Sequence, residues 1–243
     1  MLFSLLNGGN PKEAIASLLF ALPVIFLALS VHEVAHGFVA WKCGDSTAYN
    51  LGRLTLNPLK HLDPMGTLCM LLVGYGWAKP VPVNTRNFRN PKRGMALTAA
   101  AGPAANLLMG IFGSVLAGVF LALMNYTHLT DSPILWQNVC TWSYILFNLM
   151  GYLNFMYMAF NLIPVPPFDS SRIALFFLPE KTYFKVMRYE RQIMMGVLLT
   201  LLVLSYLLDF SPFSWVASNL ANLIEVPIAK GILSLMFPSI NFV

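Results

Sequence analysis

The feature that most constrains this chain is a group of three ionisable side chains inside a long apolar segment. Residues 14–41 carry no charge other than the one at Glu33, which lies next to His32 and three residues before His36. An ionisable group inside a membrane helix costs roughly 2.5–3.5 kcal/mol on insertion scales. Three such groups in about one helical turn need a compensating partner, and a bound metal ion is the obvious one.

The spacing of these residues follows the pattern His-Glu-x-x-His. Positions four apart share one face of an α-helix, so the imidazoles of His32 and His36 can reach the same ion. Glu33 would then face the open position of that ion, where water binds, and we expect it to be the catalytic residue. The alternative is that both histidines are polar residues of a helix bundle, paired with each other or with the backbone.

The composition is that of an integral membrane protein. The chain is 57% hydrophobic and only 10% charged, whereas soluble domains are about 25% charged. Its basic residues do not accompany a soluble fold, so we expect no nucleic-acid partner and a lipid bilayer as the surroundings. Three widely spaced cysteines predict neither a disulfide framework nor a thiolate zinc site. The first apolar segment is too long for a cleavable signal peptide, and we expect it to be retained.

We therefore expect an all-α polytopic membrane protein with about four to six membrane helices, forming a single metalloprotease domain over residues 1–243. Residues 65–77 are too few to cross a bilayer and are interpreted as a re-entrant segment. Residues 170–191 have the alternation of an interfacial helix, and Pro227 makes the last segment a weaker candidate span. The expected long helices are 14–41, 94–124, 134–163, 192–209 and 213–237.

Two stretches near the motif predict short β-strands. Residues 47–57 alternate and contain β-branched side chains, which favours one or two strands. Residues 79–84 contain Pro80 and Pro82 and read as an extended edge strand. We thus expect a small hairpin or strand region near the metal site.

The basic residues predict the topology. Loops 42–93 and 170–191 contain thirteen of the fifteen Lys and Arg residues, whereas loops 125–133 and 210–212 contain none. The positive-inside rule places the two basic loops in the cytoplasm. The same arrangement brings His32 and His36 to the side on which helix 134–163 ends, so we expect the active site to face the cytoplasm.

A catalytic zinc site has three protein ligands and one open position, so a third ligand must come from elsewhere. Asp131 and Asp209 lie on the wrong side of the predicted topology. We favour Asp169 over Asp63, because Asp169 directly follows a proline-rich break that ends a membrane helix. Capping of the helix that begins at Ser170 is the alternative role for this aspartate. The carboxylates considered are Asp45, Asp63, Asp131, Asp169, Asp209, Glu180 and Glu190.

The motifs together resemble the site-2 protease family of intramembrane zinc metalloproteases. The resemblance is carried by His-Glu-Val-Ala-His-Gly at 32–37 and Asn-Leu-Ile-Pro-Val-Pro-Pro-Phe-Asp at 161–169. Further stretches resemble the compact prokaryotic branch, which has no PDZ or CBS module: Gly-Arg-Leu-Thr-Leu-Asn-Pro at 52–58, Asp-Pro-Met-Gly-Thr at 63–67, Gly-Trp-Ala-Lys-Pro-Val-Pro-Val-Asn at 76–84 and Ala-Gly-Pro-Ala-Ala-Asn at 101–106.

This resemblance implies a prokaryotic plasma-membrane enzyme that hydrolyses peptide bonds within transmembrane segments of its substrates. It implies one Zn²⁺ per chain, held by His32, His36 and Asp169, with Glu33 as the catalytic residue. It also implies that an unwound transmembrane substrate pairs with the strands expected at 47–57 or 80–84.

One departure concerns the third ligand. The family usually has Leu-Asp-Gly at this point, whereas this chain has Phe168-Asp169-Ser170. The aspartate is kept, but serine disfavours the positive φ that glycine allows. Two other functions were weighed: a catalytically inactive membrane scaffold or chaperone of the same fold, and a zinc transporter. The intact Glu33 argues against the first, and the gathering of ionisable residues in one place argues against the second.

Asparagines on the predicted membrane helices are a further candidate group. Asn106, Asn154 and Asn161 lie in apolar helices and are expected to point into the bundle. One of them would bind the substrate backbone near the zinc, or each would make an ordinary hydrogen bond between helices.

Overall fold

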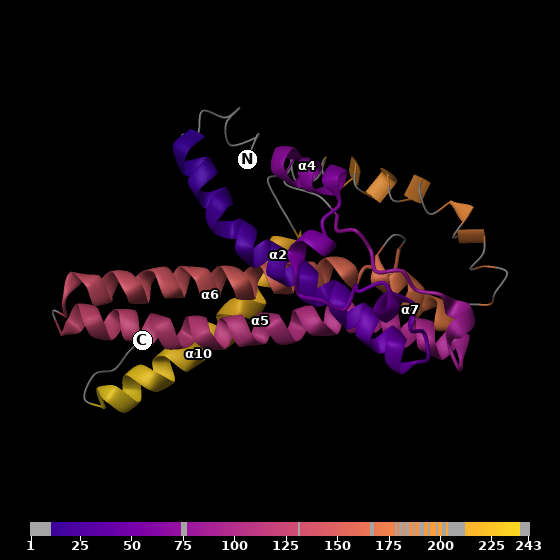
Figure 1. Cartoon of the computed structure of the whole chain (residues 1–243). Helices are drawn as coiled ribbons and strands as arrows, with labels where there is room; N and C mark the ends of the chain where they lie inside the picture. The colour runs from indigo at the N-terminus through magenta and orange to yellow at the C-terminus, as the bar shows by residue number, and fades with distance from the viewer. Residues whose placement is uncertain are drawn as a thin grey trace. The chain divides into compact units, whose positions relative to one another are not determined.

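The computed structural model describes residues 11–73, 77–130, 132–165, 168–177 and 212–238, together with residue 179 and scattered positions between 182 and 203. The described part is helical, which confirms the all-α prediction (Figure 1). In chain order the elements are α2 (Pro11–Lys42), α3 (Thr47–Asn50), η1 (Pro58–Lys60), α4 (Pro64–Val73), η2 (Thr85–Asn87), α5 (Pro91–Leu129), α6 (Ile134–Asn161), α7 (Asp169–Phe177) and α10 (Pro212–Met236).

Four of the long helices predicted from the sequence are present, as α2, α5, α6 and α10. Two helices are long and apolar enough to cross a membrane by length and composition, Ile15–Lys42 and Pro91–Leu129. The predicted count of four to six membrane helices is therefore not confirmed. Only scattered positions are described in the predicted span 192–209 and in the part of the predicted interfacial helix 170–191 beyond α7, so neither prediction is tested.

The short helix α4 supports the re-entrant interpretation of residues 65–77. Its 10 residues correspond to about 15 Å at 1.5 Å per residue, half of what a bilayer core requires. Asp63 caps its first turn, because its Oδ1 accepts the N–H of Gly66 at 2.8 Å.

The strand prediction is wrong for Thr47–Asn50, which form the helix α3. The Thr47 N–H donates to the side chain of Asp45, a contact that starts a turn and competes with strand pairing. Residues 80–84 belong to no regular element, and the β-pairing in the described part is one isolated bridge between Leu62 and Ala78. Pro80 and Pro82 remove two of the donors that a ladder would need, so the predicted hairpin is not confirmed.

The chain divides into two compact units. The first comprises Met1–Ala105 and Asn161–Leu202, and the second comprises Asn106–Phe160 and Val203–Val243. Helix α5 passes from one unit into the other at Ala105. The expectation of a single domain over 1–243 remains a prediction.

In the second unit, α5 and α6 run side by side. Gly113 and Gly151 allow this approach, because a Cβ at Gly113 would lie only 2.6 Å from the Gly151 backbone nitrogen. The Asn106 amide donates to the Asn154 side chain at 2.8 Å, and both residues are fully buried. This confirms that these asparagines point inward and gives them the role of a hydrogen bond between helices.

In the first unit, α2 ends where glycine permits a left-handed residue. Gly44 has a φ of 115°, its N–H donates to the Trp41 carbonyl, and the N–H of Asp45 donates to the Ala40 carbonyl. This is the Schellman arrangement that closes the last turn of a helix. It places the Asp45 side chain directly after the metal-motif helix.

Asp45 joins the end of α2 to the loop before α5. Its carboxylate is fully buried and accepts the N–H of Asn84 at 2.7 Å and the Asn87 amide at 2.8 Å. It also accepts the N–H and the hydroxyl of Thr47. Burial opposes ionisation, but these donors outweigh burial and hold the pKa of the Asp45 carboxyl below its ordinary value.

We expect Asp45→Ala to destabilise the protein by about 2–3 kcal/mol, because the change leaves several donors without a charged acceptor. The lowered pKa means that this contribution is present above the ordinary aspartate pKa of about 3.9 and is lost as the pH falls through the folded-state value. Thermal unfolding in detergent at several pH values measures both effects. Asp45→Asn keeps one acceptor oxygen and should lose less, while a pH-independent gap between wild type and Asp45→Ala would contradict the assignment.

Candidate metal centre

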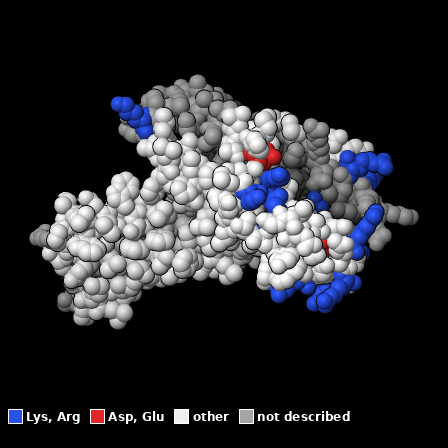
Figure 2. Space-filling model, viewed as in Figure 1, with Lys and Arg blue, Asp and Glu red and all other residues white. Residues whose placement is uncertain are grey.

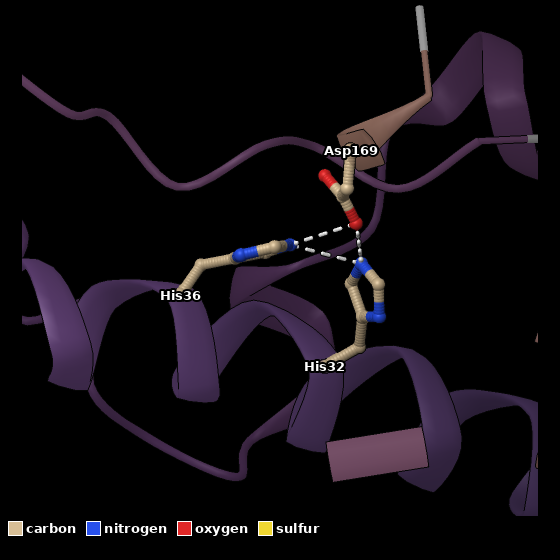
Figure 3. Close-up of side chains that lie close together, drawn as sticks. All are labelled: His32, His36 and Asp169. Atoms are coloured by element: carbon tan, nitrogen blue, oxygen red, sulfur yellow. Dashed lines mark hydrogen bonds and ion pairs between the residues drawn. The ribbon is translucent and has the colours of Figure 1, made fainter. Parts of the chain in front are cut away.

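Helix α2 supplies two imidazoles that meet on one face. The Nε2 atoms of His32 and His36 lie 3.0 Å apart, and both residues are buried (Figure 3). Their rings make an edge-to-face pair with centroids 4.6 Å apart. The four-residue spacing thus places two ligand nitrogens at one point, as the helical period predicts.

Asp169 completes the group from the first turn of α7. Its Oδ2 lies 3.1 Å from His32 Nε2 and 3.2 Å from His36 Nε2, and Figure 3 shows the carboxylate facing both rings. In the part of the chain that the structure describes, His32, His36 and Asp169 form the one group of three such residues that could hold a metal ion.

The residue after Asp169 shows how the departure from Leu-Asp-Gly is accommodated. Ser170 lies within helix α7, so no positive φ is required there. Its hydroxyl donates to the Ile163 carbonyl at 2.6 Å, and the Ser171 hydroxyl donates to the Phe168 carbonyl at 2.7 Å. These bonds hold the turn between α6 and α7, and they fix where the Asp169 carboxylate points.

The other carboxylates considered as third ligand are engaged elsewhere or fall outside the described residues. Asp45 is surrounded by donors of the loop at 84–87, and Asp63 caps α4. Asp131, Asp209, Glu180 and Glu190 lie outside the described residues. His61, considered with Asp63, is buried and its Nε2 donates to the Thr55 carbonyl at 2.7 Å.

A backbone carbonyl fixes the tautomer of His36. The Nδ1 atom lies 2.7 Å from the carbonyl oxygen of Thr98 in α5. A carbonyl can only accept, so Nδ1 carries a proton, and in the neutral imidazole Nε2 is the nitrogen left to bind a metal ion. Such a bond to the remote nitrogen orients metal-binding histidines in general. No sequence signal marks this contact, because any residue of α5 can supply a carbonyl.

Gly102 leaves the space in which the imidazoles lie. A Cβ at this position would come closer than 3.0 Å to His36 Nε2 and to His32 Cε1. Within the first unit, this glycine lets the backbone of α5 pack closely against the two histidines. A methyl group here would occupy the place of the ligand nitrogens.

Glu33 is held by the loop that precedes α5. Its Oε2 accepts the N–H of Val81 at 2.8 Å, and the carboxylate is mostly buried. The structure thus brings Glu33 close to a segment 48 residues further along the chain. Sequence reasoning placed this segment near the site as a strand but did not identify the contact.

The three candidate ligands suit a divalent cation. Burial opposes the charged form of Asp169, but the two imidazoles beside it outweigh burial and lower the pKa of its carboxyl. Asp169 Oδ2 is buried and has no hydrogen-bond donor of good geometry among the described residues. Oδ2 lies 3.2 Å from His36 Nε2, a spacing that needs a positive charge between the two atoms, and either a proton on the imidazole or a bound metal ion supplies it. A tetrahedral zinc ion with bonds of about 2.0–2.1 Å separates its ligand atoms by roughly 3.3 Å, which matches this spacing.

The helical fold and the buried His-Glu-x-x-His group, joined by a distant aspartate, define the class of helical proteins with a metalloprotease-type centre. The chain is 37% identical over 166 residues to the Bacillus subtilis protein named "Putative zinc metalloprotease YwhC", which covers 68% of this chain and 72% of that protein. It is 30% identical over 148 residues to "Putative zinc metalloprotease Rip2" of Mycolicibacterium smegmatis and 29% identical over 149 residues to the Mycobacterium tuberculosis protein of the same name. The two mycobacterial matches each cover 59% of this chain and 51% of the relative.

The chain belongs to the site-2 protease family, as the resemblance of its motifs implied. It spans about half the length of the two mycobacterial relatives. No protein-family model matches it, and no solved structure matches it significantly.

We expect Gly102→Ala to weaken zinc binding on the order of 10-fold or more, comparable to the loss of a group that orients a ligand, because the new methyl group displaces both imidazoles. Zinc titration of the purified protein measures the effect. Gly231→Ala in α10 is the matched control, since nothing lies within 4 Å of a Cβ there. Unchanged zinc affinity in Gly102→Ala would show that the space at Gly102 is not needed for the site.

Proposed function

We propose that this protein is a zinc metalloendopeptidase that cleaves transmembrane segments of membrane-protein substrates. One Zn²⁺ per chain would be held by His32, His36 and Asp169, with Glu33 as the catalytic residue. The observation that carries the proposal is the meeting of three ligand atoms, His32 Nε2, His36 Nε2 and Asp169 Oδ2, at 3.0–3.2 Å from one another. The names of the relatives, as zinc metalloproteases, support the choice of metal and reaction.

Each residue has a distinct chemical task in this proposal. Zinc, when bound, supplies a Lewis acid that lowers the pKa of a water ligand toward about 7. Glu33 takes a proton from the attacking water and returns it to the leaving amine. The Thr98 carbonyl keeps the proton of His36 on Nδ1, and the N–H of Val81 holds one oxygen of Glu33.

Exposed apolar side chains support a location in the bilayer. Leu19 on α2 is 62% exposed, and Leu108 and Phe112 on α5 are 68% and 55% exposed. Large side chains of this kind on long helices suit lipid better than water. On the face shown in Figure 2, the Lys and Arg side chains form separate groups, a few acidic side chains lie near them, and large areas carry no charge. Their bias toward loops 42–93 and 170–191 supports a cytoplasmic side for the site.

The segment at residues 79–84 is the proposed contact for an unwound substrate. It lies beside the site, because Val81 bonds Glu33, and it is anchored by Lys79, whose N–H donates to the His61 carbonyl at 2.8 Å. Arg53 donates to the Lys79 carbonyl at 2.8 Å. No described residue donates to the carbonyls of 80–83, so these remain as acceptors for the N–H groups of an extended substrate.

Metal content tests the ligand set without a substrate. We expect about one zinc per chain in the wild type and loss of that zinc in His32→Ala and in Asp169→Ala, because each change removes one of three ligands. Mass spectrometry of the purified protein gives the stoichiometry, with Asp63→Ala as the control that should keep its metal. Zinc retained in Asp169→Ala would assign the third ligand elsewhere, and a wild type without metal would favour the inactive scaffold.

Glu33→Gln separates the protease from a scaffold of the same fold. We expect zinc to remain bound while cleavage falls by at least about 100-fold, since general-base catalysis contributes about 10²–10⁴. The assay uses a tagged single-span fusion protein with an Asn-Pro pair in its transmembrane segment, reconstituted in vesicles with the enzyme. Equal cleavage by wild type and Glu33→Gln would exclude Glu33 as the catalytic base.

A further inference from the structure

The segment before α5 contains an unusual distribution of backbone donors. In Lys79-Pro80-Val81-Pro82-Val83, the two prolines have no N–H, so three amides remain. The Lys79 N–H is used by the His61 carbonyl. The Val81 N–H lies between the prolines and points to Glu33 Oε2 at 2.8 Å. Within the described residues, the Val83 N–H has no hydrogen-bond partner.

We propose that the backbone N–H of Val81 is the positioning group for Glu33. It fixes Oε2 and leaves Oε1 as the oxygen that exchanges protons with water. This inference rests on the proposed role of Glu33 as base, but the contact itself does not depend on that role. Val81 is a positioning residue, because it acts through Glu33 and not on the reacting atoms.

The packing around Val81 makes this contact rigid. Val81 is 8% exposed, and its Cγ1 lies against Gly37, where an added Cβ would be 3.1 Å away. Gly37 lies four residues after Glu33 and so on the same face of α2. The side chain of Val81 therefore packs one turn beyond the carboxylate that its N–H holds, and both contacts set the distance between the loop and α2.

The ends of the segment are fixed by independent bonds. Arg53 holds the Lys79 carbonyl at 2.8 Å, and Asp45 holds the Asn84 N–H at 2.7 Å. Val81 lies between these two anchors, and each flanking proline restricts φ to about −65°. The Val81 N–H is thus preorganised, so the loop loses no further conformational entropy when the N–H binds Glu33. Preorganisation of this kind is what a catalytic carboxylate needs to keep one orientation.

Hydrogen exchange tests the contact without any substrate. A proteolytic fragment from Ala78 to Val83 has only three exchangeable backbone amides, those of Lys79, Val81 and Val83, so a change at one of them is measurable by mass spectrometry. We expect the Val81 amide to be protected in the wild type and in Glu33→Gln, whose side-chain oxygen still accepts, and to exchange at least about 10-fold faster in Glu33→Ala. Identical exchange in all three proteins would overturn the proposal.

The kinetic test removes the N–H itself. Val81→Pro deletes the donor in a segment already flanked by prolines, and it also removes the packing of the Val81 side chain on Gly37. Val81→Ala, which loses the same packing but keeps the N–H, is the matched control. With the tagged Asn-Pro fusion protein in vesicles, we expect Val81→Pro to lower kcat about 10- to 100-fold with one zinc per chain retained, because the base loses its orientation. Val81→Ala should keep a kcat at least about 10-fold above that of Val81→Pro.

Two outcomes contradict the positioning role. Equal losses of kcat in Val81→Pro and Val81→Ala would show that the packing of Val81 matters and its N–H does not, and an unchanged kcat in Val81→Pro would show that Glu33 needs no donor. If the proline variant does not fold, the test is repeated with Val81 replaced by α-hydroxyisovaleric acid, which keeps the side chain and has an ester oxygen in place of the N–H. A wild type without peptidase activity would refute the proposed function, while the hydrogen-exchange result would still stand.

Discussion

Three atoms that each carry a lone pair or a negative charge meet in the first unit, and the surrounding structure holds them together. His32 Nε2, His36 Nε2 and Asp169 Oδ2 lie 3.0–3.2 Å from one another. A buried carboxylate between two imidazoles needs a positive charge among the three groups, from a proton or from a metal ion. The contacts around the group hold the three atoms at a spacing from which one cation can be bound. Helix α2 supplies two of them at a spacing that its own period fixes, and the turn before α7 supplies the third.

Small residues provide the room that this arrangement needs. Gly102 lies against both imidazoles, and Gly37 lies against Val81 and Leu54. In each case a methyl group would enter a place already filled by a side chain of the site. The glycine of α5 thus admits the ligands, and the glycine of α2 admits the segment that holds Glu33. The packing of the helices therefore sets the geometry of the site. A larger residue at Gly102 would displace the imidazoles, and one at Gly37 would displace the segment that holds Glu33.

The sequence was sufficient to predict the structure where the period of a helix or the fixed ring of a proline determines it. The helical period alone predicted that His32 and His36 share a face, and the proline-rich break at the end of helix 134–163, with the predicted topology, placed Asp169 on the same side as these histidines. It was not sufficient where a side chain decides between local structures. The alternation in 47–57 favoured strands, but the Asp45 carboxylate draws the Thr47 N–H into a turn, and α3 follows. The carbonyl of Thr98 and the N–H of Val81 carry no sequence signal, because every residue has a carbonyl and every residue except proline has an N–H.

The carboxylates of the first unit differ in how fully donors satisfy them, and this difference separates structural from chemical roles. Asp45 accepts four hydrogen bonds, which join the end of α2 to the loop before α5. Glu33 accepts one, from Val81. Asp169 Oδ2 has no well-placed donor among the described residues, although it is buried. A carboxylate whose oxygens all accept hydrogen bonds is not available to another partner, whereas one held by a single donor keeps an oxygen free and one without a donor is open to a cation. The order Asp45, Glu33, Asp169 is therefore the order expected of a structural anchor, a general base and a metal ligand.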